Sequence, residues 1–102
     1  MKEEIELYIR RAEKFERDAK FDFEHGDNDL AMFHIEQAFQ LMIKAKLLDL
    51  KGYFERTHSL RRLLKDLAEV YKKEEILRYI DRYKAVLRNL ERAYLCYISL
   101  LL

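Results

Sequence analysis

The chain has 102 residues, of which half are apolar and 38% are charged, and this composition predicts one soluble globular domain over residues 1–102. A formal net charge of +1 gives no global field that would attract nucleic acid or an anionic membrane. The charged N-terminus excludes a signal peptide, and the lone Cys96 cannot form an internal disulfide, so we expect a cytoplasmic protein without a membrane partner. Two asparagines and two glutamines beside 20 basic and 19 acidic residues are a composition typical of thermophiles.

The N-terminal half predicts an antiparallel pair of long helices over residues 2–24 and 29–50. The first has a single apolar stripe made of Ile5, Tyr8, Ala12, Phe15, Ala19 and Phe23. The second is apolar on nearly all sides, which predicts a central helix with Ala38 and Leu41 fully buried. The short link at Gly26, a residue that tolerates the left-handed conformation, predicts a hairpin.

The C-terminal half predicts a loop and two further helices. In the loop KGYFERT, Tyr53 and Phe54 are expected to fold back on the core, and Thr57 is expected to cap a helix from about 58 to 72. A heptad-like series then predicts a fourth helix, through Ile76, Ile80, Tyr83, Leu87, Leu90, Tyr94, Tyr97 and Leu101. We place the break near residues 72–74, with one bent continuous helix as the alternative. The expected fold is an all-α, up-and-down bundle of about four helices.

A second apolar row lies beside that series, at steady seven-residue intervals. It consists of Tyr79, Val86, Ala93 and Leu100. Three partner helices should not need this additional apolar surface, so the row predicts a homodimer interface.

The polar residues do not form a convincing catalytic constellation. The sequence lacks a Gly-rich phosphate loop, a CxxC pair and a histidine or carboxylate spacing that suits a metal, so we expect no metal and no cofactor. His25 is expected at the end of the first helix, near the negative end of its dipole. His34 is expected to be a hydrogen-bonded helix histidine.

The densest basic cluster lies at the start of the third helix. Arg56, His58, Arg61 and Arg62 could hold a nucleotide or phosphate there, because a helix N-terminus favours an anion. The alternative is a solvated helix start. The basic residues of the fourth helix have acidic neighbours at helical spacing, Glu91 three after Arg88 among them, which favours a salt-bridged face over a nucleic-acid track.

Several short motifs, in this order and spacing, resemble the HEPN domain (higher eukaryote and prokaryote nucleotide-binding). They are Ala12-Glu13, Asp18-Ala19, Gly26-Asp27, Ala31-Met32-Phe33, Glu36-Gln37-Ala38, Lys44-Ala45 and Thr57-His58-Ser59-Leu60. The sequence departs from the family pattern at Gln40, where the family usually has Glu. The resemblance implies a helical bundle that tends to dimerise and is often encoded with a small nucleotidyltransferase, in toxin–antitoxin-like pairs.

Many members of the family are metal-independent ribonucleases with an Arg followed, about four to six residues later, by His. Arg88-Asn89 resembles the start of that motif, but Ala93, Tyr94 and Leu95 occupy the positions of the histidine. We therefore expect a binding or partner module without catalysis. The alternatives are a purely structural homodimer and a ribonuclease with a degenerate or composite site, which residues beyond Leu102 would complete.

Overall fold

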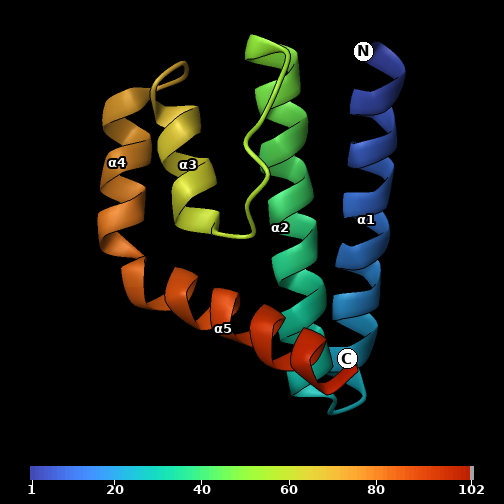
Figure 1. The fold of residues 1–102 in the computed structure, drawn as a ribbon. Coiled ribbons are helices and arrows are strands. Elements are labelled where there is room, and N and C mark those ends of the chain that lie inside the picture. Colours follow the sequence, from blue (N-terminus) through green and yellow to red (C-terminus); the bar gives the residue numbers. More distant parts are fainter. Residues whose placement is uncertain (102) are drawn as a thin grey trace.

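In a computed structural model, which describes the backbone of residues 1–101 and the side chains of residues 1–95, the chain folds into helices only (Figure 1). The helices of this described part are α1 (Lys2–Glu24), α2 (Asn28–Lys51), α3 (Leu60–Ala68), α4 (Lys73–Arg82) and α5 (Lys84–Leu101). The all-α fold is confirmed, with five helices in place of about four. Within the described residues, no helix is both long enough and apolar enough to cross a membrane.

Helices α1 and α2 form the predicted antiparallel hairpin and lie side by side along most of their length (Figure 1). Their bounds agree with the prediction to within one residue. Gly26 adopts the left-handed conformation between them, with φ of +82°, and Gly52 ends α2 in the same way, with φ of +80°.

Helix α2 is the central helix, because it packs against α1, α3 and α5. The prediction that Ala38 and Leu41 are fully buried is wrong, since both are half-buried. Ile35 and Met42 are exposed, with exposed fractions of 47% and 49%. Helices α3 to α5 cover one side of the hairpin only (Figure 1). These two apolar side chains of α2 are therefore left uncovered.

The hydrophobic core lies between α2 and the three shorter helices. Its buried members are Ile43, Leu47, Leu60, Leu63, Leu64, Leu67, Ile80 and Leu87. Phe54 packs against this core, as expected, and meets the ring of Tyr8 edge-on at 5.7 Å. Tyr53 does not fold back and is exposed.

Helix α3 is shorter than predicted at both ends. Its N-cap is Ser59, whose hydroxyl accepts a hydrogen bond from the backbone N–H of Arg62, whereas Thr57 was the predicted cap. The helix ends at Ala68 and the chain turns over residues 69–72, where Lys72 takes a left-handed φ of +43°. A bent continuous helix is therefore excluded, and a lysine makes the turn without glycine.

A second break, at Tyr83, was not predicted. It separates α4 from α5 and sends α5 across the end of the bundle towards α2 (Figure 1). Tyr79 therefore lies on α4, while Val86 and Ala93 lie on α5; the side chain of Leu100 is outside the described residues. The row does not run along one helix, so seven-residue spacing does not place its members on one side of a helix. The dimer interface at these residues stays a prediction.

Candidate functional site

A ladder of polar side chains runs along the inner face of α2. Glu36, Gln40 and Lys44 follow one another at four-residue intervals, so they share one side of the helix. The Lys44 ammonium donates to the Gln40 amide oxygen over 2.8 Å, and the Gln40 amide nitrogen donates to the Glu36 carboxylate over 3.0 Å. Glu36 is fully buried, with 0% of its surface exposed. This is an unusual place for a carboxyl group.

Two other elements bring ionisable side chains to the same ladder. The loop before α3 contributes His58, and α5 contributes Glu91 and Tyr94. The rings of His58 and Tyr94 stack with their centroids 4.5 Å apart, and the Tyr94 hydroxyl lies 3.1 Å from His58 Nε2. We call Glu36, Gln40, Lys44, His58, Glu91 and Tyr94 the polar cluster.

Burial and mutual proximity shift the pKa values of the cluster. Burial raises the pKa of Glu36 to about 7, although hydrogen bonds from Gln37 and Gln40 oppose this rise. Burial also lowers the pKa of Lys44, and it lowers the pKa of His58, where the nearby Lys44 charge adds to the effect.

The pKa of Tyr94 is raised, first by burial and then by the nearby Glu36 charge. A neutral imidazole and a protonated phenol are therefore both favoured, so the Tyr94 O–H can donate to His58 Nε2 in the tautomer that has its proton on Nδ1. Shifted ionisable groups that gather from three elements mark a candidate functional site.

The predicted phosphate position at the start of α3 is filled by the side chain of Glu91. Its carboxylate accepts from the backbone N–H of Arg61 over 3.1 Å and from the Arg61 guanidinium over 3.1 and 3.4 Å, and the Ser59 hydroxyl donates to it over 3.2 Å. Burial alone would raise the pKa of Glu91, but the hydrogen bonds and charge of Arg61 outweigh it and lower that pKa.

The four basic residues predicted to bind an anion are thus divided by the fold. Arg61 is held by Glu91, and Arg62 pairs with Glu55 over 2.8 Å on the surface. Arg56 is exposed in the loop, and His58 joins the polar cluster. His58 is therefore the predicted residue that best fits a ligand site.

Arg88-Asn89, which resembles the start of the family's ribonuclease motif, lies exposed on α5, one turn before Glu91. The predicted pairing of Arg88 with Glu91 is wrong, because Glu91 reaches Arg61 instead. Tyr94, which occupies one of the positions of the motif histidine, is the residue that contacts His58. The fold thus places His58 beside Tyr94, one of the positions at which the family motif would have a histidine.

The other two histidines are structural, as predicted. His25 ends α1 and its Nδ1 lies 2.8 Å from the carbonyl oxygen of Phe21. His34 Nδ1 lies 2.6 Å from the carboxylate of the buried Asp22, which joins α2 to α1. Among the described residues, the histidines and acids do not form a group that could hold a metal ion.

Sequence reasoning assigned no site role to Glu36, Gln40, Lys44 or Tyr94. A signal was present in the four-residue spacing of Glu36, Gln40 and Lys44 on a helix expected to be buried all round. The departure at Gln40 also has a reason, because one amide can both donate to Glu36 and accept from Lys44. A glutamate there would place a second carboxyl group against Glu36.

The comparison with family models matches residues 5–96 to the HEPN domain, which is most of the chain. Neither the curated proteins nor the solved structures gave a match.

Proposed function

The chain belongs to the HEPN domain family, and on this premise we propose that it is a binding module for a nucleotide or a short single-stranded RNA. The observation that carries the proposal is the gathering of shifted ionisable groups at the polar cluster, from α2, α5 and the loop before α3. We assign no catalytic step to the module.

The geometry around His58 suits a nucleotide. Tyr94 covers one face of the His58 ring. Phe33 in turn stacks on Tyr94, with the two ring centroids 6.1 Å apart. His58 itself is exposed, so its outer face can accept a base by stacking. Its Nδ1, which carries the proton when Nε2 accepts from Tyr94, can donate to the ligand.

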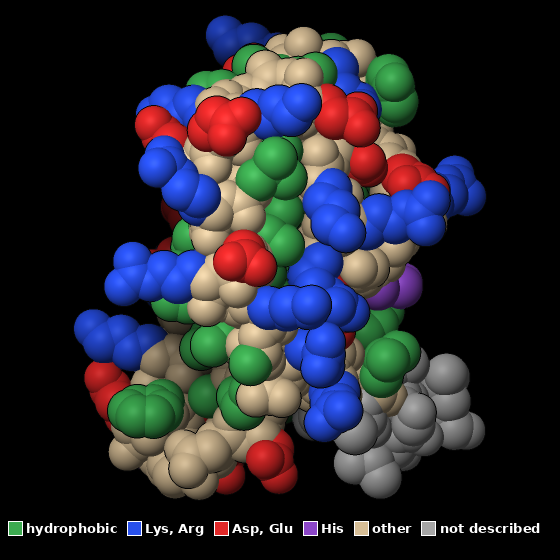
Figure 2. Space-filling view, turned by 90° about the vertical axis from the view of Figure 1, so that its left-hand side faces the viewer, with side chains coloured by type: hydrophobic (Ala, Val, Ile, Leu, Met, Phe, Trp, Pro, Cys, Tyr) green, Lys and Arg blue, Asp and Glu red, His purple; other side chains and the backbone are tan. Residues whose placement is uncertain are grey.

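Basic side chains near the cluster suit the phosphate. Residues 73–95 hold six basic and four acidic residues, and one of those acids, Glu91, is bound to Arg61. Figure 2 shows Lys and Arg side chains along the middle of the side of the molecule that carries α4. The exposed basic residues of α5 are Lys84, Arg88 and Arg92. Together with Arg56 they can attract a polyanion to His58.

Replacement of His58 by alanine should weaken nucleotide or RNA binding by about tenfold or more, the loss typical of one stacked base. Calorimetry with common nucleotides and a short single-stranded RNA measures this. His25→Ala is the matched control, because His25 stacks on Phe21 at the turn between α1 and α2 and is not part of the polar cluster. This variant should bind as the wild type does. Equal affinity of the wild type and His58→Ala would reject the site.

A metal-independent ribonuclease is the second candidate, and the position of His58 supports it, because His58 lies beside Tyr94, which occupies one of the places where the family motif would have its histidine. In this reading, His58 would replace the histidine absent after Arg88 and act as the general base, a role that a neutral imidazole can perform. Arg88 would stabilise charge on the phosphate.

Incubation of the purified protein with single-stranded RNA and a chelator separates the two candidates. Because the imidazole Nε2 is already engaged by Tyr94, we expect no cleavage. Cleavage that is abolished by both His58→Ala and Arg88→Ala, and retained in His25→Ala, would establish the ribonuclease. Cleavage that survives all three changes would come from a contaminant.

The proposal also includes partners. A small nucleotidyltransferase, in a toxin–antitoxin-like pair, is the protein partner that the family resemblance favours, and a second copy of the chain is the other. The lone Cys96 favours a cytoplasmic setting. A purely structural homodimer remains the outcome if no nucleotide or RNA binds.

A further inference from the structure

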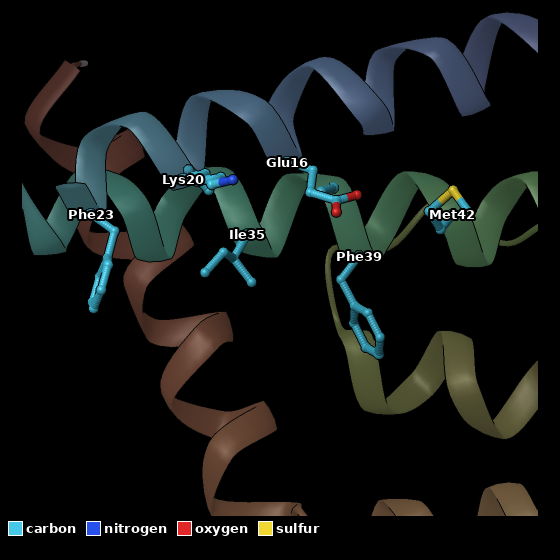
Figure 3. A pocket seen from close by; sticks show the side chains of 8 residues that line it. Glu16, Lys20, Phe23, Ile35, Phe39 and Met42 are labelled. Carbon is cyan, nitrogen blue, oxygen red and sulfur yellow. The ribbon is translucent and has the colours of Figure 1, made fainter.

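Two hollows lie along the α1–α2 hairpin, and they have no lining residue in common. The first has apolar walls, and Figure 3 shows Phe23, Ile35 and Phe39 projecting to the same side of it. Lys20 is the one basic residue of its lining, and the acid Glu16 lies one turn away on α1. The first hollow therefore favours no particular ligand.

The second hollow differs in having two basic side chains. Its volume is about 530 Å³, and it is lined by Arg11, Lys14, Phe15 and Asp18 of α1 and by Gln37 and Leu41 of α2. Arg11 and Lys14 are three residues apart, so they lie on the same side of α1. Neither forms an ion pair with another described residue, whereas Arg61 and Arg62 each hold a carboxylate. Two such cations at one hollow indicate an anion site.

Gln37 adds a further donor and connects the second hollow to the polar cluster. Its amide nitrogen donates to the carboxylate of Glu36 over 3.1 Å, and the other N–H of that amide can donate to a ligand. Phe33, which stacks on Tyr94, lies one turn before Gln37, or about 6 Å along α2. The second hollow is therefore close to the aromatic stack that includes His58.

A phosphate group suits these donors better than a carboxylate does. A phosphomonoester carries about two negative charges near pH 7, and a guanidinium can bind it through two parallel N–H···O bonds while an ammonium adds a point charge. The walls between the donors are the half-buried side chains of Phe15 and Leu41, which exclude water and so strengthen the attraction.

We propose that the second hollow binds a phosphate group through Arg11, Lys14 and Gln37. The group can belong to a free phosphomonoester or to the backbone of an RNA strand that also stacks a base on His58. The RNA source rests on the proposed function, whereas the free phosphomonoester does not. Asp18, the one acid of the lining, repels the anion and limits its affinity.

Inorganic phosphate is the probe for the free source, and the nuclear magnetic resonance signals of the Gln37 side-chain amide report its binding. Arg11→Gln and Lys14→Gln should each raise the dissociation constant for phosphate about tenfold. Lys20→Gln is the matched control, because it removes the same charge from α1 at the first hollow, and it should leave that constant unchanged.

Asp18→Asn tests the sign of the site, because it removes the one acid and keeps the shape of the side chain. It should lower the dissociation constant for phosphate about two- to fivefold, the effect of one exposed charge. A site for a cation would respond in the opposite direction.

A short single-stranded RNA tests the other source. If its backbone occupies the second hollow, Lys14→Gln and His58→Ala should each weaken RNA binding. If only His58→Ala weakens it while phosphate still binds, the source is a free phosphomonoester and the proposed function stands. If phosphate binds and RNA and nucleotides do not, the proposed function fails and the phosphate site stands.

Three results overturn the proposal. The first is that neither phosphate nor RNA binding is weakened by Arg11→Gln or Lys14→Gln. The second is that Lys20→Gln weakens binding as much as Lys14→Gln does, since the attraction would then come from the overall charge. The third is that Asp18→Asn weakens binding.

Discussion

Replacement of Leu47 by alanine should lower the free energy of unfolding by about 2–5 kcal/mol. Leu47 lies on α2 with 0% of its surface exposed and belongs to the core formed with Leu60, Leu63 and Leu87. The other buried members of this core come from α2, α3, α4 and α5, so the cavity left by the lost side chain cannot readily collapse. Equilibrium denaturation in guanidinium chloride measures the change.

Leu41→Ala is the matched control on the same helix. The sequence favoured Leu41 as a core residue, but it is half-buried beside an open hollow that Arg11 and Lys14 also line. Water can fill the space left by the substitution, so the expected loss is below about 2 kcal/mol. If Leu41→Ala costs as much as Leu47→Ala, or Leu47→Ala costs less than about 1 kcal/mol, our assignment of the core is wrong.

The elements that could be predicted from the sequence are those that one periodic pattern determines. The bounds of α1 and α2 follow from a stripe on one helix, from an apolar run on the other and from the glycines between and after them. The break at Tyr83 carried no such signal. The apolar series continues through it in phase, with Ile80 and Leu87 buried on either side, and neither glycine nor proline marks it. The bend lets α5 pack against α2 and α3.

The candidate site was harder to predict, because its members are far apart in the sequence. The basic neighbours of His58 predict an anion site at the start of α3, yet in the fold His58 contacts Tyr94, which lies 36 positions later. Arg61 was selected as an anion ligand, but its anion is Glu91 of the same chain. A carboxylate that satisfies a helix N-terminus from another helix leaves no local pattern, since its position depends on how α3 and α5 pack.

Glu36 should make the protein less stable as the pH rises from about 4.5 to about 7. Its carboxyl is fully buried, and burial raises its pKa from 4.5 to about 7. In that interval the folded protein holds a proton on Glu36 that the unfolded chain releases, so a higher pH favours unfolding. At about 1.4 kcal/mol per pKa unit, the whole effect is about 3 kcal/mol.

Other ionisable groups of the cluster also change the stability with pH, and not all in the same direction. Measurements on the wild type alone therefore do not isolate the contribution of Glu36. The pKa of His58 is lowered, which means that His58 contributes stability that is lost as the pH falls below its usual pKa of 6.5. The lowered pKa of Glu91 adds a loss below about pH 4.5. A comparison between the wild type and Glu36→Gln, in which these groups remain, cancels their contributions.

Glu36→Gln has almost the same shape as the wild-type side chain and keeps an oxygen that can accept the hydrogen bond from Gln40. Relative to the wild type, it should gain about 3 kcal/mol of stability between pH 4.5 and pH 8, because it has no proton to lose. Denaturation at several pH values measures the difference, and Leu47→Ala, an uncharged change in the core, should lower stability by the same amount at every pH. A difference in unfolding free energy between Glu36→Gln and the wild type that stays constant with pH would mean that Glu36 ionises in the folded protein as it does in water. The buried position of Glu36 in the polar ladder would then be wrong.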